Sequence, residues 1–205
     1  MRGIRAGLLL LPCLLVACSV QPESAPTTET PPPAATEDHA TMPEMAKAPT
    51  TPDEMIASAM SAAPEAVAKD ATIITVDDKM QVQTLRAGTN GWTCVPDQAS
   101  SPGPDPMCVD ANGMGWMMAW MEHKDPPAGK MAFAYMLMGG SDASNDDPFA
   151  TTPKPGDEWL TTGPHVMVLN IGDRFDGYPT APGDAKTPYV MYPNTPYAHL
   201  MIPVK

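Results

Sequence analysis

The first fifty residues of the chain differ in composition from the rest, and this division sets which part can fold into a domain. Met1 to Arg5 carries two positive charges, and an apolar run from Ala6 to Val16 follows. A charged start, a short apolar stretch and small residues before a cleavage point are typical of an export signal. The run is too short to cross a hydrocarbon core of ~30 Å as a helix. Residues 1–17 are therefore predicted to be a signal peptide that is removed.

The leader ends in Leu15-Val16-Ala17-Cys18, which resembles the lipobox of bacterial lipoproteins. In these proteins the cysteine is acylated and becomes the first residue of the mature chain. Two or three acyl chains hold a protein stably at a membrane, so Cys18 predicts a lipid anchor that includes palmitate-type chains. An ordinary signal peptide cut nearby is the alternative. The resemblance implies export, and Ser19 favours the outer membrane, facing the periplasm, if the cell is Gram-negative.

Residues 18–50 continue as a linker. After the cysteine, the segment contains Pro31-Pro32-Pro33, many threonines and alanines, scattered acids and no aromatic residue. This composition buries too little apolar surface to offset the entropy of ordering. We therefore expect a flexible stalk between the acyl group and the folded domain.

The acidic charge balance excludes some partners. The chain has 24 acidic and 12 basic residues, and removal of Arg2 and Arg5 with the leader leaves 10 basic residues and a formal charge near −14. Such a chain repels phosphate backbones and anionic headgroups, so nucleic acid is not an expected partner. The membrane is instead reached through the lipid at Cys18. The sequence contains no second apolar run of ~18 residues that would predict a transmembrane helix.

Cysteine usage agrees with export. Cys13 leaves with the leader and Cys18 carries lipid, so Cys94 and Cys108 remain. One leftover pair in an exported chain most simply forms a disulfide, whose loop of about 15 residues is worth ~3 kcal/mol in the chain-entropy treatment. Two buried thiols are the alternative. A redox-active pair is disfavoured because no C-x-x-C spacing is present.

Beyond the linker the patterns predict a short helical segment and one mixed domain. Residues 51–67 begin with a capping box between Thr51 and Glu54, with proline at the first helical position. Pro64 is expected to interrupt this helical segment. Residues 68–205 are predicted to be a single globular α+β domain.

The domain is expected to contain an antiparallel sheet of about six strands, one main helix and long loops rich in proline and glycine. β-branched or alternating runs indicate the strands, and Asn90-Gly91 predicts a hairpin that makes the first three strands consecutive and antiparallel. The expected strands are 72–76, 81–85, 92–95, 131–138, 165–169, 189–191 and 198–202.

The main helix is predicted to begin at Asp105, which acts as its cap, and to run to about Glu122. Its methionines lie on one stripe with the spacing of a core face, and we favour core packing for them over copper binding. They are Met114, Met117, Met118 and Met121.

Five short motifs stand out in the domain: Asn90-Gly-Trp-Thr-Cys94, Asp105-Pro-Met-Cys108, Asn145-Asp-Asp-Pro148, Gly163-Pro-His-Val-Met167 and Thr195-Pro-Tyr-Ala-His199. Together they resemble a family of uncharacterised exported bacterial proteins, lipoproteins among them, over about residues 70–203. The resemblance implies a single exported domain and carries over no activity.

His165 and His199 are the leading candidates for chemistry. Each lies at or near the start of a predicted strand beside a loop rich in proline and glycine, so the imidazoles meet if the strands are neighbours. With Asp142, Asp146 or Asp147 from the long loop they would bind a divalent metal or act as acid and base. The alternative is two structural histidines bonded to backbone carbonyls. Imidazoles close to each other and to a carboxylate in an open cleft favour chemistry, whereas buried imidazoles on carbonyls favour structure.

A second candidate metal cluster lies in the linker. His39, Met42 and Met45 are close in sequence, and the chain has 17 methionines. Thioether and imidazole groups suit Cu(I). A dedicated copper carrier would show denser repeated methionine motifs, so weak copper binding here is an alternative only.

The sequence therefore predicts a membrane-anchored envelope lipoprotein whose domain has a non-enzymatic binding or structural role. Its expected partners are the membrane, through Cys18, and an unknown protein or small-molecule ligand, and no cofactor is predicted. One alternative is a metal-dependent or acid–base enzyme centred on His165 and His199. The other is weak periplasmic copper binding through methionine and histidine.

Overall fold

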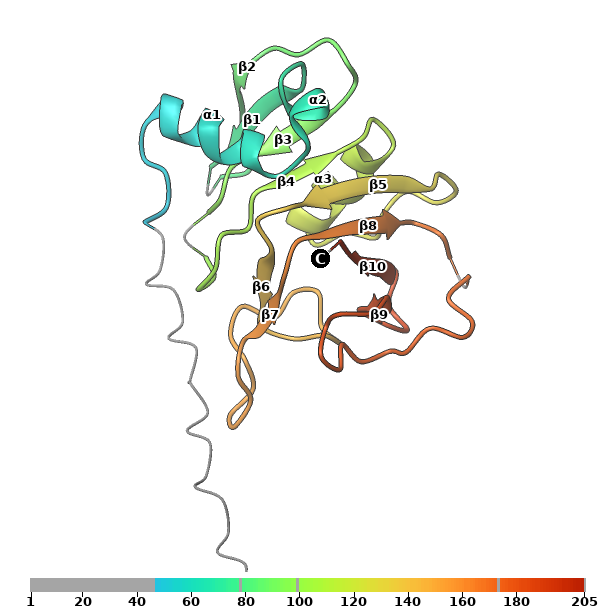
Figure 1. Cartoon of the computed structure of the whole chain (residues 1–205). Helices are drawn as coiled ribbons and strands as arrows, with labels where there is room; N and C mark the ends of the chain where they lie inside the picture. The colour runs from blue at the N-terminus through green and yellow to red at the C-terminus, as the bar shows by residue number, and fades with distance from the viewer. Residues whose placement is uncertain (1–46, 78, 99, 173, 205) are drawn as a thin grey trace, which may run out of the picture. The chain divides into compact units, whose positions relative to one another are not determined.

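The computed structural model describes residues 47–204, except 78, 99 and 173 (Figure 1). The predicted signal peptide, Cys18 and the candidate copper ligands His39, Met42 and Met45 lie outside the described residues. The described part is a single mixed α+β domain, mostly sheet with few helices, as predicted. No helix within these described ranges is long and apolar enough to cross a bilayer.

Three helices and ten strands follow one another along the described residues. They are α1 (Pro52–Ser61), α2 (Glu65–Ala68), β1 (Thr72–Val76), β2 (Val82–Arg86), β3 (Thr93–Val95), β4 (Met107–Val109), α3 (Gly113–Met121), β5 (Ala132–Met136), β6 (Gly140–Asp142), β7 (Leu160–Thr162), β8 (His165–Leu169), β9 (Tyr189–Met191) and β10 (His199–Pro203).

Eight of these strands form one sheet in the order β2-β1-β3-β4-β5-β8-β10-β9, and β6 pairs with β7 in a separate two-stranded sheet. In Figure 1 the large sheet descends from β2 at the top to β9 near the bottom. All neighbours are antiparallel except β1 and β3, so the mostly antiparallel character is confirmed. The predicted number of about six strands is wrong, chiefly because β4 lies where a helix was expected.

The predicted hairpin between the second and third strands is also wrong. β3 pairs in parallel with β1, on the side away from β2. Asn90 does form a turn, since its Oδ1 accepts from the Trp92 N–H at 3.0 Å and its Nδ2 donates to Val67 O at 2.8 Å. The prediction of a turn at Asn90 is therefore correct. This turn lies in the connection between β2 and β3, which do not pair with each other, and so it does not close a hairpin.

The predicted start of the main helix is wrong as well. Residues 107–109 form β4, and α3 begins only at Gly113. β4 pairs antiparallel with β3, with Cys108 directly opposite Cys94, and the predicted disulfide joins them with the Cα atoms 4.0 Å apart. A cross-strand partner thus outweighs the helix-start preference of Asp105 and the proline that follows it.

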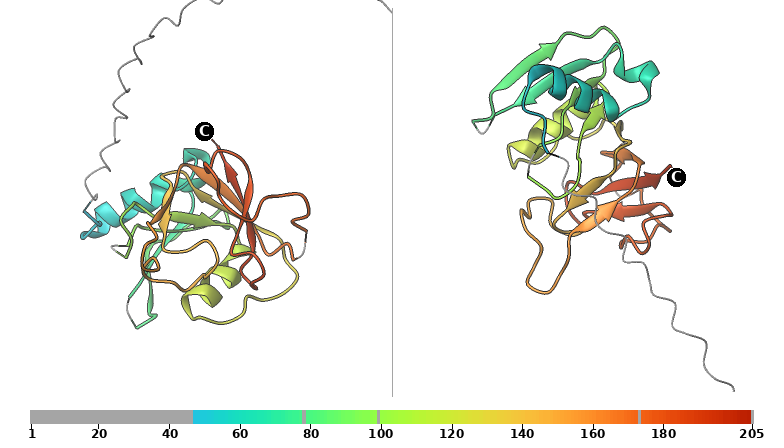
Figure 2. Two further views of the ribbon diagram at one scale, coloured as in Figure 1. Left: turned by 90° about the horizontal axis from the view of Figure 1, so that it is seen from below. Right: turned by 60° about the vertical axis from the view of Figure 1, so that its left-hand side comes forward.

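Both faces of the sheet are covered. In β1, Ile73 and Ile74 belong to different cores because successive residues of a strand point to opposite faces. α1 packs on the face that holds the disulfide, where Ala59 is fully buried. α3 packs on the other face through Trp116 and Met117 (Figure 1, Figure 2). The α1 segment therefore shares a core with the sheet.

The beginning of α1 follows the predicted capping box. The Thr51 hydroxyl accepts from the Glu54 N–H at 3.3 Å, and Glu54 Oε2 accepts from the Thr51 N–H at 3.0 Å. Pro64 ends the first helical segment and precedes α2, as expected. In α3, Met117 is fully buried in the core and Met114 and Met121 are partly buried against it, whereas Met118 is half-buried outside this cluster, so the core interpretation of the methionine stripe holds in part.

The long loop after β5 contains the small β6–β7 sheet. Gly139 enters it with φ of +87°, and a Cβ there would lie 2.4 Å from Thr162 O, so only glycine fits without displacement. This close approach places Ser141 and Asp142 beside the large sheet. The loop, which was expected to lack strands, thus gives Asp142 a fixed position.

Candidate functional site

His165 and His199 lie on neighbouring strands, β8 and β10. The ladder places His165 opposite Pro203, and His199 is four residues away from Pro203 along β10. At ~3.3 Å per residue this register separates the two Cα atoms by about 13 Å along the strands. The strands are therefore neighbours, as the expected site required, but the two histidines are not opposite each other.

Both histidines nevertheless project from the same buried face of the sheet. His165 is directly opposite Pro203, so the two share a face, and His199 is an even number of residues away from Pro203 on the same strand. Methionines are their neighbours across the ladder. Three of the cross-strand pairs on this face join only histidine and methionine side chains: Met136–His165 (β5–β8), Met167–Met201 (β8–β10) and Met191–His199 (β9–β10). We call these six side chains the histidine face.

Each imidazole is held by one hydrogen bond to a backbone carbonyl. His165 Nδ1 lies 2.7 Å from Gly163 O. His199 Nδ1 lies 2.9 Å from Tyr197 O. Because a carbonyl only accepts, each Nδ1 carries a hydrogen, and Nε2 of the neutral ring carries the lone pair. Within the described residues neither Nε2 has a hydrogen-bond partner, and both histidines are only 2 % exposed.

Burial keeps the two rings neutral. Desolvation lowers the pKa of His165, and its bond to Gly163 opposes this. Desolvation also lowers the pKa of His199 to about 4; the bond to Tyr197 opposes this effect, and repulsion by His165 adds to it. At neutral pH both present an unprotonated nitrogen.

The surroundings of His199 are aromatic. The rings of Trp116 and Tyr192 lie edge-on to it, with centroids 5.6 Å and 5.5 Å away. Trp116 Nε1 and the Tyr189 hydroxyl also lack partners in the described part of the chain. Two donors and two acceptors are thus left unpaired in one core, although buried polar groups are normally satisfied.

Asp142, the predicted carboxylate partner of the histidines, belongs to a different group. We call Asp97, Asp105 and Asp142 the carboxyl cluster. The Tyr192 hydroxyl donates to Asp142 Oδ1 at 2.9 Å. The Ser141 N–H donates to Asp105 Oδ1 at 2.7 Å, and the Asp105 N–H donates to Asp97 Oδ1 at 2.9 Å. Each carboxyl group of the cluster therefore accepts a hydrogen bond from another part of the protein.

Desolvation raises the pKa of all three acids. It raises the pKa of Asp105 to about 7; the Ser141 N–H opposes this, and the charges of Asp142 and Asp97 add to it. It raises the pKa of Asp142 to about 6, against the bond from Tyr192. It also raises the pKa of Asp97, which backbone N–H groups oppose. Asp105 and Asp142 are therefore interacting acids whose pKa values are raised toward neutrality, and the pKa of Asp97 is raised in the same direction.

The expected group of two histidines and a loop carboxylate does not form. Asp142 approaches His199 through Tyr192, whose hydroxyl and ring contact one each. Asp146 and Asp147 lie in a turn where their N–H groups donate to the Ser144 hydroxyl at 3.0 and 3.1 Å. Asp146 lines a separate hollow of about 420 Å³. In this turn the Asp147 carboxylate accepts from the Phe149 N–H at 2.9 Å, and among the described residues no hydrogen bond joins Asp146 or Asp147 to an imidazole.

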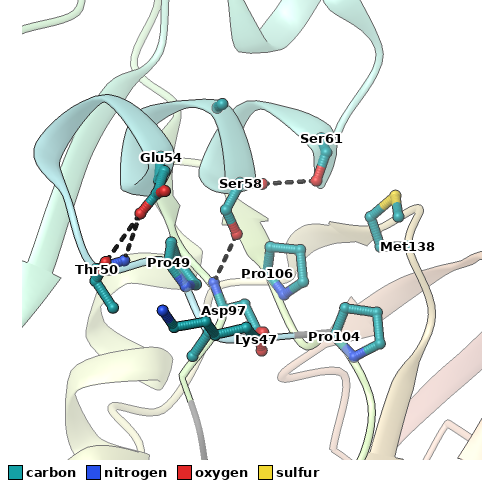
Figure 3. A pocket seen from close by; sticks show the side chains of 12 residues that line it. Lys47, Pro49, Thr50, Glu54, Ser58, Ser61, Asp97, Pro104, Pro106 and Met138 are labelled. Atoms are coloured by element: carbon teal, nitrogen blue, oxygen red, sulfur yellow. Dashed lines mark hydrogen bonds between the residues drawn. The ribbon is translucent and has the colours of Figure 1, made fainter. Parts of the chain in front are cut away.

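A groove of about 400 Å³ lies beside α1 (Figure 3). Its acidic side chains are already engaged in structural bonds. Glu54 accepts from Thr50 and Thr51, and these bonds lower its pKa to about 2. Asp97 accepts from the Asp105 N–H. Much of the remaining lining is apolar and includes Ala57, Pro49, Pro104, Pro106 and Met138.

Several residues of the carboxyl cluster and of the surroundings of the histidine face were not predicted from the sequence to belong to a site. Asp97, Asp105 and Tyr189 had no assigned site role, and Trp116 was assigned to core packing. One signal was present, because both acids lie between Cys94 and Cys108, whose bridge forces the intervening loop to return to the sheet. The orphan atoms on Trp116 and Tyr189 had no signal, since only tertiary packing decides whether a polar atom finds a partner.

Comparison of the chain with protein-family models, curated proteins and solved structures finds no match. The resemblance to exported bacterial proteins therefore stays a prediction. In the described residues, no three side chains among His, Cys, Asp and Glu are placed to hold one metal ion.

Proposed function

We propose that this chain is an exported envelope protein, held at a bacterial membrane by lipid on Cys18, and that its folded domain binds a ligand without catalysing a reaction. The charged and apolar leader and the lipobox-like residues 15–18 support the anchor. The Cys94–Cys108 disulfide supports export, because disulfides persist in oxidising compartments.

The observation that favours a non-enzymatic domain is the closed burial of both imidazoles. An acid–base histidine must reach the proton it transfers, within hydrogen-bond distance or through one water. His165 and His199 are buried, lie apart in the register, and contact no carboxylate. This arrangement is the one expected to disfavour the enzyme alternative.

The α1 groove supports the same conclusion. Its acids, Glu54 and Asp97, accept hydrogen bonds from backbone N–H groups, and its Ser58 hydroxyl accepts from the Asp97 N–H at 3.0 Å. These hydrogen bonds give the three side chains a role in the local fold. The groove thus offers surface for contact and no assembled catalytic group.

The anchor is tested by labelling cells that express the full chain with a fatty acid. We expect label in the wild type and in Cys13→Ser, and no label in Cys18→Ser, which should also leave the membrane fraction. Cys13→Ser is the matched control because it changes a cysteine five residues earlier in the same leader. Label that persists in Cys18→Ser would overturn the anchor.

The non-enzymatic role is tested by histidine acylation of the folded chain, followed by peptide mass spectrometry. His123 is exposed and serves as the internal control. We expect His123 to react quickly, and His165 and His199 to react only after denaturation. Reaction of either buried histidine at the rate of His123 would show an open imidazole and would favour the enzyme alternative.

A further inference from the structure

We propose that the α1 groove binds residues 42–46 of its own chain, with the side chains of Met42 and Met45 packed against its apolar lining. This inference goes beyond the proposed function, because it names what covers the groove. It also gives the two linker methionines a role other than copper binding. An external partner reaches the groove only by displacing this segment.

The first observation is the path by which the described chain enters the domain. Residues 47–50 themselves line the groove, together with residues of α1 and of the loop 96–106 (Figure 3). Their course is fixed at the helix start, since Glu54 Oε2 accepts from the N–H groups of Thr50 and Thr51 at 2.9 and 3.0 Å. The residue before Lys47 is therefore held at the groove by its peptide bond.

Residues 42–46 are too few to leave this neighbourhood. Five extended residues span at most about 18 Å. A segment tied to a surface by so short a connection has a high effective concentration there, so modest apolar contacts suffice to hold it. A separate peptide of the same sequence lacks this advantage.

The second observation is the apolar character of the groove. Its acidic side chains already accept hydrogen bonds from backbone N–H groups, and its lining includes Pro49, Ala57 and Pro104. Met138 also lines it and is 49 % exposed, although its side chain is large and apolar. Ligand sites are mostly apolar hollows of ~300–1,000 Å³. A groove of about 400 Å³ with this lining fits apolar side chains better than a charged ligand.

The third observation is the placement of apolar side chains in the linker. Between Ser19 and Ala46 only three side chains are large and apolar, namely Val20, Met42 and Met45. Two of the three thus lie within the last five residues before the groove. Methionine fills irregular gaps well, because its unbranched thioether side chain is flexible. The linker is therefore most apolar directly beside an apolar groove.

The spacing of the two methionines suits one backbone conformation. Pro43 disfavours a helical backbone at Met42 and favours an extended or polyproline II one. A polyproline II helix has three residues per turn, so Met42 and Met45 lie on the same side of it, ~9 Å apart along the axis. Both methionines then face the groove, and Glu44 does not share their side.

The experiment uses Met138 as the reporter and Met131 as its internal control. The two are matched, because they are 49 % and 50 % exposed and Met131 does not line the groove. The full-length protein purified from cells is treated briefly with hydrogen peroxide, and peptide mass spectrometry measures the initial rate of sulfoxide formation at each residue. Because oxidation requires access to the sulfur, we expect Met138 to react at least about 5-fold more slowly than Met131.

The variant Met42→Ser/Met45→Ser removes the large apolar side chains of the segment. We expect Met138 then to react at the rate of Met131, because serine adds no large apolar surface that would hold the segment in the groove. Met42→Leu/Met45→Leu keeps the apolar surface and should protect Met138 as the wild type does.

Val20→Ser is the matched control, because it changes the third large apolar side chain of the linker, far from the groove in sequence. It should leave the rates at Met138 and Met131 as they are in the wild type. Circular dichroism and a constant rate at Met131 check that each variant is folded.

The inference is overturned if Met138 and Met131 react at the same rate in the wild type. It is also overturned if Met138 stays protected in the folded Met42→Ser/Met45→Ser variant, since a different surface then covers it. Neither result changes the attachment of lipid to Cys18 or the reactivity of the buried imidazoles, so failure of this inference is distinguishable from failure of the proposed function.

Discussion

The histidine face and the carboxyl cluster are both buried groups of titratable side chains, yet they use their polar atoms differently. In the carboxyl cluster every acid accepts a hydrogen bond from the protein, as Asp105 does from the Ser141 N–H. On the histidine face each ring uses Nδ1 and leaves Nε2 without a partner among the described residues. Each acid of the carboxyl cluster thus has a hydrogen-bond partner within the protein, whereas the histidine face keeps two acceptor nitrogen atoms without one in the described residues.

This difference predicts different effects of substitution in the two regions. The carboxyl cluster ties the 96–106 loop to β6, because Asp105 bonds both to Asp97 and to Ser141. Removing it should loosen the fold. The histidine face contributes packing but few bonds, so removing an imidazole should change acid sensitivity more than stability at neutral pH.

The largest expected effect is on acid stability. The pKa of His199 is about 4 in the folded chain and near its ordinary 6.5 when unfolded, so the unfolded state binds more protons between these values and stability is lost as pH falls from 6.5 to 4. For this buried ring the loss reaches about 3 kcal/mol. We expect His199→Leu to lack it and to lie within about 1 kcal/mol of the wild type at pH 7.5.

Urea unfolding of both proteins at pH 7.5 and pH 4.5 measures this difference, and the contributions of the other acids cancel between them. His123→Asn is the control and should follow the wild type at both pH values. An equal acid loss in wild type and His199→Leu would mean that the ring is not held neutral.

The next effect concerns the bonds of the carboxyl cluster. Asp105→Ala leaves the Ser141 N–H and the Ser101 hydroxyl without their acceptor. We expect a loss of about 2 kcal/mol in the free energy of unfolding at pH 5, where the carboxyl group is mostly neutral. Asp157→Ala, at an exposed site, should stay within about 0.5 kcal/mol. Equal values for the two variants would show that the cluster does not brace its loop.

The smallest effect has the opposite sign to the first. The pKa of Asp105 is raised from 3.8 to about 7, so the unfolded state loses its proton first, and stability is lost as pH rises through 7. Because Asp105 is only partly buried, we expect about 1 kcal/mol, or a fall in Tm of ~2–4 °C, between pH 5 and pH 8. Asp105→Asn keeps an acceptor but cannot ionise, so its Tm should fall less, as scanning calorimetry will show. A wild-type slope that the variant shares would assign the effect to other groups.

The sequence predicted those elements whose formation depends on residues close to one another in the chain. The capping box of Thr51 and Glu54 begins α1, and the alternating run 165–169 is β8 with the predicted bounds. The disulfide followed from counting cysteines. These features depend on neighbouring residues or on composition, so they can be read before any tertiary contact is known.

Features set by distant contacts were not predictable in this way. Asp105 is a good helix cap, but Cys108 pairs with Cys94 and draws residues 107–109 into the sheet. Asn90 signals a turn, but nothing near it specifies that β3 pairs in parallel with β1. The candidate site shows the same limit: His165 and His199 were found, whereas the register that separates them and pairs them with methionines is a property of the whole sheet.

The strand order β8-β10-β9 has a consequence for the timing of assembly. β9 precedes β10 in the chain, yet β10 is its only ladder partner in the described sheet. Residues 189–191 can therefore join the sheet only after residues 199–203 have been inserted beside β8. Since Met191 and His199 both belong to these late strands, a chain that lacks residues 199–203 has no complete histidine face.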